Sequence, residues 1–188
     1  MNDNQEDFKT FYPFPKIPRL NRACTITEKI DGTNAQIIID PEGNISAASR
    51  NRMITPEDDN MGFARWVQEN AEELKGLGTG RHFGEWWGLS IQRRYAEPKK
   101  IFSLFNVARF EHPASRPACC SVVPKLFEGQ FSTDIVDRTL VDLRSNGSLA
   151  SPGFMDPEGI VVFLHASKSM FKVTCKDDEK PKRDNGAS

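Results

Sequence analysis

The sequence has no long apolar run, no signal peptide and almost no net charge. No apolar stretch reaches the roughly 20 residues that a membrane-spanning helix needs, so we expect no membrane partner. The acidic first residues lack the positive and apolar regions of a secretory signal. A net charge of −1 gives no general attraction to nucleic acid, so any binding of phosphates must come from a local basic surface.

The number and spacing of the cysteines bear on zinc binding and on the cellular compartment. The four cysteines, Cys24, Cys119, Cys120 and Cys175, show no Cys-x-x-Cys spacing, which argues against a structural zinc site. They predict reduced thiols and a cytoplasmic location. The chain has 188 residues, enough for one sizeable core, and 38% of them are hydrophobic, which is typical of a globular domain.

Apolar periodicity predicts an α+β domain with antiparallel sheets and flanking helices. Helices are predicted at residues 60–75 and 133–144, each followed by a glycine that ends the pattern. Strands are predicted at residues 24–29, 34–40, 45–49, 82–87, 99–107, 159–164 and 170–175, with a turn at residues 41–44 and an irregular segment at 111–124. Because helices and strands intermix without regular alternation, antiparallel pairing is favoured. We expect one domain over residues 1–176 and a flexible, charged tail over residues 177–188.

One lysine stands at a position suited to covalent chemistry. In Lys29-Ile30-Asp31-Gly32-Thr33-Asn34, Lys29 ends a β-branched run directly before a tight turn. A lysine nitrogen can attack phosphorus when it is deprotonated and its target is held in line. Taken alone, Asp-Gly is also a common hairpin turn beside which a lysine is solvated. The choice between these interpretations therefore depends on the motifs in the rest of the chain.

Five further segments occur after it in a fixed order. They are Ser49-Arg50-Asn51-Arg52, Phe83-Gly84-Glu85-Trp86-Trp87-Gly88, Ile101-Phe102-Ser103-Leu104-Phe105-Asn106-Val107, Asp156-Pro157-Glu158-Gly159-Ile160-Val161-Val162 and Phe171-Lys172-Val173-Thr174-Cys175-Lys176. Together with the Lys29 segment, this series resembles the covalent nucleotidyltransferases: ATP-dependent DNA ligases, RNA ligases and mRNA capping enzymes. Asn34, where DNA ligases and capping enzymes usually have arginine, favours the ATP-dependent RNA ligases.

The resemblance implies a role for each matching residue. Lys29 would form a covalent lysyl-AMP with ATP, AMP would pass to a 5′-phosphate of RNA, and a 3′-hydroxyl would seal the phosphodiester. Glu158 would hold Mg²⁺ or Mn²⁺, in part through water, and Glu85 is a second candidate metal ligand. The remaining nucleotide-binding assignments are Glu28 and Phe105 for adenine, Arg50 and Glu85 for ribose, Asn34 for the α-phosphate, and Lys172 and Lys176 for the phosphates.

The last lysine motif departs from the family pattern. The family has two lysines separated by one residue, but Thr174 occupies the second place here, so Lys176 is the next choice and Lys180 another. The chain ends at residue 188, where DNA ligases and capping enzymes continue into an OB-fold and many RNA ligases into a helical domain. We therefore expect a bare catalytic core that resembles small phage and bacterial ligases of RNA repair. Its sealing step could require a partner domain or protein.

Other functions remain open on the sequence alone. One alternative is a minimal DNA ligase, or an adenylyltransferase that activates ends without sealing them. Another is a non-catalytic module that binds nucleotides or nucleic-acid ends. For an RNA ligase, the acceptor could be a nicked duplex or single-stranded RNA. Arg93, Arg94, Lys99 and Lys100 form a basic loop that is either an ordinary solvated surface or a phosphate contact.

Overall fold

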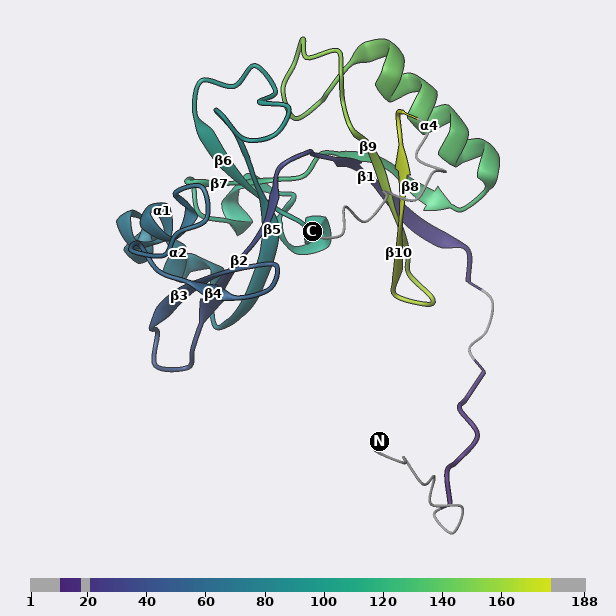
Figure 1. Cartoon of the computed structure of the whole chain (residues 1–188). Helices are drawn as coiled ribbons and strands as arrows, with labels where there is room; N and C mark the ends of the chain where they lie inside the picture. The colour runs from purple at the N-terminus through teal and green to yellow at the C-terminus, as the bar shows by residue number, and fades with distance from the viewer. Residues whose placement is uncertain (1–10, 18–20, 177–188) are drawn as a thin grey trace, which may run out of the picture.

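The chain folds into two β-sheets that lie side by side, as the computed structural model in Figure 1 shows for residues 11–17 and 21–176. The smaller sheet is antiparallel and has the strand order β10-β9-β1-β8. Its strands are β1 (Ala23–Lys29), β8 (Lys125–Gln130), β9 (Gly159–Leu164) and β10 (Ser169–Thr174). Strands distant in sequence are thus neighbours in this sheet, and β1 lies between β8 and β9.

The larger sheet has six strands in the order β4-β3-β2-β5-β6-β7. They are β2 (Thr33–Ile39), β3 (Ile45–Ser49), β4 (Met53–Ile54), β5 (Gly80–Gly88), β6 (Lys100–Leu104) and β7 (Cys120–Val122). All neighbours are antiparallel except β6 and β7, which run parallel. A hairpin connection joins β2 to β3, as the sequence predicts.

The helices pack outside the two sheets (Figure 1). Next to the larger sheet lie α1 (Phe63–Glu69), α2 (Ala71–Leu74) and the 3-10 turn η1 (Lys75–Leu77). The short α3 (Val107–Phe110) and η2 (Pro113–Ser115) connect β6 to β7. Helix α4 (Thr133–Asn146) covers the smaller sheet. None of the helices in the described part of the chain is long and apolar enough to cross a membrane.

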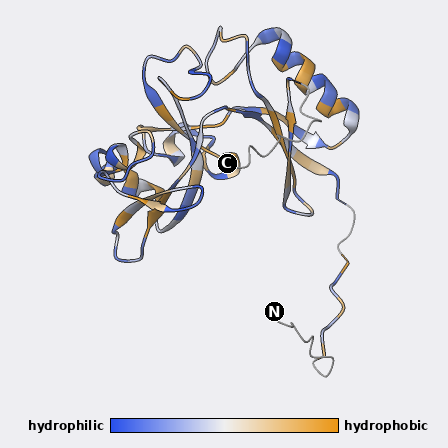
Figure 2. Cartoon of the chain, in the orientation of Figure 1, coloured by the Kyte–Doolittle hydropathy of each residue, from blue (hydrophilic) through white to orange (hydrophobic). Residues whose placement is uncertain are grey.

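Strand alternation gives each sheet one apolar and one polar face. In β1, Cys24 and Ile26 join the core under α4, so Thr25, Thr27 and Lys29 point to the opposite face. The core of the larger sheet likewise takes Ala35, Ile37 and Ile39 of β2 and packs them against α1. Figure 2 shows the resulting mixture of apolar and polar residues along the strands and α4. The helices therefore cover the apolar faces, and the polar faces stay available for chemistry.

The predicted α+β class with antiparallel sheets is confirmed, with local corrections. The predicted helix over residues 60–75 is interrupted at Asn70, whose backbone leaves the helical region (φ −108°, ψ 13°) and whose side-chain amide donates to the Trp66 carbonyl at 2.8 Å. The strand predicted over residues 99–107 ends at Leu104, because Asn106 caps α3. The residues 111–124 contain η2 and β7, and β8 was not predicted. All four cysteines are free, and the tail expected at 177–188 lies outside the described residues.

A short turn carries the chain from one sheet to the other directly after Lys29. Ile30 is buried in a third core with Trp87, Tyr95 and Val123, which fills the junction between the sheets. Gly32 lies against β5, where an added Cβ would stand 2.5 Å from the Trp86 carbonyl oxygen and 2.8 Å from the Trp87 Cβ. The turn is therefore fixed by packing, and glycine is required by close contact.

This contact generates a stability prediction. We expect Gly32→Ala to lower the free energy of unfolding by about 1–3 kcal/mol or more, because backbone and ring atoms of β5 must move to admit the methyl group. Gly76→Ala is the control, since its Cβ would meet only Pro117 Cγ at 3.7 Å, an ordinary contact. Urea denaturation of both variants measures the difference, and equal stabilities would contradict the proposed packing.

Candidate active site

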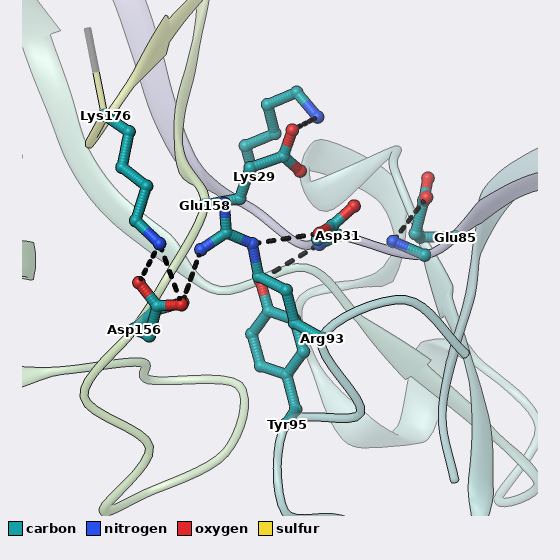
Figure 3. Close-up of polar contacts among 9 residues, drawn as sticks. Lys29, Asp31, Glu85, Arg93, Tyr95, Asp156, Glu158 and Lys176 are labelled. Atoms are coloured by element: carbon teal, nitrogen blue, oxygen red, sulfur yellow. Dashed lines mark hydrogen bonds and ion pairs between the residues drawn. The ribbon is translucent and has the colours of Figure 1, made fainter. Parts of the chain in front are cut away.

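Lys29 and Glu158 form an ion pair at the ends of two neighbouring strands. Lys29 is the last residue of β1 and lies opposite Gly159, the first residue of β9. Glu158 immediately precedes Gly159, and its Oε1 lies 2.6 Å from Lys29 Nζ (Figure 3). The two side chains are 26% and 18% exposed, so the pair is accessible without being fully solvated. The antiparallel register of β1 and β9 therefore brings two residues 129 positions apart into contact.

The second carboxylate oxygen of Glu158 has an unusual environment. Glu158 Oε2 is buried and has no hydrogen-bond partner among the described residues. A buried carboxylate oxygen without a partner is unfavourable, commonly by about 1–3 kcal/mol. Such an atom next to an accessible ammonium indicates a place where a ligand group or a hydrated metal ion would bind.

Glu85 brings a second carboxylate to the site from the larger sheet (Figure 3). The Gly32 N–H donates to Glu85 Oε1 at 3.1 Å, which ties the turn after Lys29 to β5. Burial raises the pKa of Glu85 to about 7, and the negative charges of Glu158 and Asp31 act in the same direction. Lys29 and the Gly32 N–H oppose this rise. Glu85 is thus electrostatically coupled to both members of the Lys29–Glu158 pair.

These carboxylates fit a hard divalent cation that is shared with a bound ligand. The described residues contain no group of three or more His, Cys, Asp or Glu side chains able to enclose a metal. Mg²⁺ is usually held by one or two carboxylates and completed by water and phosphate oxygens. The unpartnered Glu158 Oε2 offers one such oxygen, and Glu85 offers a second once it is ionised.

Asn34 and two aromatic residues share the polar face of the larger sheet with Glu85. Asn34 on β2 lies directly opposite Glu85 on β5. Phe105 follows β6, and its N–H donates to the Phe83 carbonyl at 2.9 Å, which extends the β5–β6 ladder. Alternation puts both rings on the face of Glu85, and they are 48% (Phe83) and 38% (Phe105) exposed. The sequence selected Phe105; Phe83, two residues before Glu85, is a neighbour it did not select.

Arg50 lies at the edge of this face, just after β3. Ser49 pairs with Ala35, which places Arg50 next to the row that contains Asn34. Its neighbour Arg52 is bonded to Asp58. Arg50 is exposed, and its guanidinium makes no hydrogen bond or ion pair within the described residues. Of the two arginines in this motif, Arg50 is thus the one whose donors are available to a ligand.

The two lysines of the last motif lie in different surroundings. Lys172 on β10 is opposite Val161, which is opposite Thr27, so register places Lys172 on the same face as Lys29. Lys176 lies beyond the end of β10 and pairs with Asp156 at 3.1 Å. The structure therefore places Lys172 on the Lys29 face and attaches Lys176 to the segment before Glu158.

Glu28 is buried, with its carboxylate turned toward the loop after α4. It accepts bonds from the Ser148 hydroxyl at 2.5 Å, the Leu149 N–H at 2.8 Å and the Ala150 N–H at 3.0 Å. Burial raises the pKa of Glu28, and these three bonds oppose the rise. The side chain thus anchors a loop beside the site. Its expected role in recognising adenine stays a prediction.

The basic loop is not a continuous cationic surface. Arg93 turns inward and pairs with Asp31 and with Asp156, at 2.9 Å each. Lys100 donates to the Met61 carbonyl at 2.7 Å, while Arg94 and Lys99 are exposed. The sequence showed only that four basic residues lie close together in this loop. The tertiary contacts show which of them, Arg93, turns inward and which remain exposed to solvent.

One surface hollow of the described residues lies away from this site. It has a volume of about 740 Å³ and lies at the opposite end of β1, around Ala23, Glu128 and His165. The candidate site is therefore identified by its chemistry, since a lysine and two carboxylates, one with an unpartnered buried oxygen, converge on it.

The raised pKa of Glu85 predicts a specific dependence of stability on pH. The native carboxyl keeps its proton up to about pH 7, whereas the unfolded chain releases it near pH 4.5. The native state binds more protons between these values, so the Glu85 contribution to the free energy of unfolding falls as pH rises through this interval. Glu85→Gln removes this loss, and the variant should gain roughly 2–3 kcal/mol relative to the wild type between pH 4.5 and pH 8.

The measurement is urea denaturation of the metal-free and nucleotide-free protein at several pH values. Glu42→Gln, in the exposed β2–β3 turn, is the control and should differ from the wild type by a constant amount. A constant difference for Glu85→Gln as well would contradict the burial argument.

Comparison with known proteins places this chain in a family. The sequence matches the RNA ligase family over residues 22–174, and no curated protein sequence matches it. A Naegleria gruberi RNA ligase mutant with ATP and Mn has a similar fold, with a TM-score of 0.59 and 20% identity, over 81% of this chain and 50% of that chain. Another mutant of that ligase, with AMP and Mn, gives 0.61 and 19% over 81% and 49%. The same ligase with PPi gives 0.59 and 20% over 81% and 49%.

The fold and the family are shown by different comparisons. The chain spans about half the length of the Naegleria ligase, and at this level of identity the likeness shows the fold. The family match covers well over half of the sequence, from before β1 to the end of β10. The resemblance expected from the order of the motifs is thereby confirmed, and the chain belongs to the RNA ligase family.

Proposed function

We propose that this chain is an ATP-dependent RNA ligase that works through a covalent lysyl-AMP on Lys29. The observation that carries the proposal is the pair of Lys29 Nζ and Glu158 Oε1 at 2.6 Å, beside an unpartnered Glu158 oxygen and the Glu85 carboxyl. The family match supports the reaction class. The Naegleria ligase structures with ATP, AMP and Mn support ATP and a divalent cation as reactants.

In the first step, Lys29 Nζ attacks the α-phosphorus of ATP. The bond from this phosphorus to the bridging oxygen breaks, pyrophosphate leaves, and a P–N bond links AMP to Lys29. The Lys29 ammonium must lose one proton before it can attack, and Glu158 Oε1, already bonded to Nζ, is the acceptor within reach. The nitrogen loses a second proton, to solvent, as the P–N bond forms. A divalent cation held by Glu158 and Glu85, in part through water, would neutralise charge on the phosphates.

The polar face of the larger sheet would hold the nucleoside. Phe105 would stack on adenine, with Phe83 beside it, while Arg50 and Glu85 would bind the ribose hydroxyls. Asn34, opposite Glu85, would donate its amide to the α-phosphate. Lys172, on the face of Lys29, would add positive charge where the leaving pyrophosphate develops negative charge.

The two later steps transfer the activated phosphate to RNA. An oxygen of the RNA 5′-phosphate attacks the AMP phosphorus and the P–N bond breaks. The Lys29 nitrogen takes up one proton as it leaves as an amine and a second to restore the ammonium. A 3′-hydroxyl then attacks the activated 5′-phosphate, forms the phosphodiester and releases AMP. Asn34 and the family match favour RNA over DNA as the acceptor.

The first prediction concerns the covalent intermediate. Incubation with ATP and Mg²⁺ or Mn²⁺ should increase the intact mass of the wild type by one adenylate, after pyrophosphate has removed any AMP already attached. Lys29→Ala should show no increase, because its side chain has no nitrogen to form the P–N bond. A mass increase in Lys29→Ala, or none in the wild type, would overturn the proposed mechanism.

The second prediction concerns the nucleic acid that accepts AMP, and it is tested with the adenylated protein. Nicked RNA, single-stranded RNA and nicked DNA of the same sequence are supplied in parallel, and we expect sealed product from RNA substrates alone. Faster sealing of nicked DNA would make the chain a minimal DNA ligase. Activated 5′ ends that accumulate without sealing would identify an adenylyltransferase or a requirement for a partner.

The choice of motif lysine is tested by a pair of substitutions. Lys172→Ala should slow self-adenylation roughly 10-fold or more, because Lys172 lies on the face of Lys29 and would stabilise charge in the transition state. Lys180→Ala, the matched loss of charge near the end of the chain, should change the rate little. Single-turnover labelling with ATP measures both rates, and equal losses would refute the assignment of Lys172.

A further inference from the structure

Arg93 connects the two chain segments that carry Lys29 and Glu158. Its Nε lies 2.9 Å from Asp31 Oδ2, and its Nη1 lies 2.9 Å from Asp156 Oδ2. Nη1 also donates to the Asp156 carbonyl at 3.1 Å. The side chains of Arg93 and Asp31 are 22% and 28% exposed, so solvent screens this pair less than it screens ordinary surface pairs, whereas Asp156 is 54% exposed. Figure 3 shows Arg93 between the two aspartates.

The two aspartates that Arg93 bridges lie close in sequence to Lys29 and Glu158. Asp31 is two residues after Lys29, and Asp156 is two residues before Glu158. Strand pairing fixes Lys29 and Glu158 from one side, through β1 and β9. Arg93 fixes the same two segments from the other side, beyond the ends of the strands.

We propose that Arg93 is a positioning residue, which holds Lys29 and Glu158 at the separation and orientation needed for attack on the α-phosphate. The inference rests on the proposed adenylation of Lys29. Arg93 does not contact the reacting atoms, and its effect passes through Asp31 and Asp156. A misplacement of a nucleophile by about 1 Å can slow a reaction roughly 100-fold, so a bridge of this kind has a large effect on rate.

The loop that carries Arg93 is anchored independently of it. Tyr95 is fully buried, and its ring lies 5.2 Å from Trp87 and 4.6 Å from Phe154 between ring centroids. The Asp31 N–H donates to the Tyr95 hydroxyl at 2.9 Å, and the Ser151 hydroxyl donates to the Tyr95 carbonyl at 2.6 Å. Loss of the Arg93 side chain should therefore leave this loop and the fold in place.

The backbone of this loop supports a role at the site. Five residues other than glycine have positive φ: Ser90 (63°), Gln92 (43°), Arg94 (62°), Tyr95 (49°) and Ala96 (55°). Such conformations are unfavourable and persist where the surrounding structure holds them, often at functional sites. They turn Arg93 inward while Arg94, the next residue, stays exposed.

A lysine at position 93 distinguishes a bridge between the two aspartates from simple neutralisation of their charge. A lysine keeps the positive charge but has one terminal nitrogen, whereas arginine donates from Nε and Nη1 to two carboxylates at once. If Arg93 only neutralised the aspartates, Arg93→Lys would restore activity. Lys176 also pairs with Asp156 but is 71% exposed, so it is a weaker substitute.

The test measures single-turnover adenylation of the full chain with ATP and Mn²⁺. The variants are Arg93→Gln, Arg93→Lys and Asp156→Asn, and Arg94→Gln is the control with the same loss of charge one residue away. We expect the maximal rate to fall about tenfold or more in Arg93→Gln and Arg93→Lys, while half-saturating ATP changes less than about threefold. Arg94→Gln should match the wild type. Arg93→Gln combined with Asp156→Asn should be no slower than Arg93→Gln alone, because both changes break the same bridge.

Each outcome decides between the hypotheses. Wild-type rates in Arg93→Gln, full recovery in Arg93→Lys, or an effect confined to half-saturating ATP would overturn the positioning role. If the wild type itself is not labelled, the proposed function fails, which is distinguishable from a failure of this inference. Thermal unfolding of each variant identifies any loss of fold. Should Arg93→Gln unfold, Arg93→Lys and Asp156→Asn still decide the question, since slowed rates in both at normal stability support the bridge and wild-type rates refute it.

Discussion

The antiparallel register of β1 and β9 is the constraint on which the candidate site depends. It places Lys29 opposite Gly159 and so brings Glu158 to the Lys29 ammonium. Gly159 has φ of 156°, and an added Cβ would stand 2.2 Å from the Val173 carbonyl oxygen, so close packing of β10 against β9 requires glycine at this position. A shift of one residue would turn Lys29 toward α4 and move the apolar residues of β1 to the polar face.

Each sheet has one apolar face that forms a core and one polar face that carries site residues, which explains how a small chain holds both. Two apolar clusters lie under the helices, and a third, around Ile30, Trp87 and Tyr95, joins the sheets next to Lys29. Because this third cluster is apolar and well packed, the charged groups above it are held by a rigid base. The polar faces then carry Lys29 and Glu158 on one sheet and Asn34 and Glu85 on the other.

The charges described beside the Lys29–Glu158 pair are arranged as ion pairs, in a chain with a net charge of −1. Lys29 is matched by Glu158, and Arg93 by Asp31 and Asp156. A general basic surface is therefore not the means by which this site would attract phosphates. Glu85 adds a carboxyl whose pKa is raised to about 7 by burial, so its charge near neutrality responds to a cation or a ligand placed beside it.

The sequence by itself determined the α+β class, most strands and the α4 helix, because these follow from local patterns of apolar residues. It also determined the resemblance to the family, because that depends on the order of motifs along the chain. Its choice of Arg50 over Arg52 as a ligand contact stays a prediction; Arg52 pairs with Asp58. Tertiary structure decided what depends on distant partners. β8 formed because β1 offered an edge for pairing, and Arg93, in a loop that the sequence predicted only as basic, bridges Asp31 and Asp156. Such outcomes arise from contacts between segments far apart along the chain, and a local pattern of residue types does not predict those contacts.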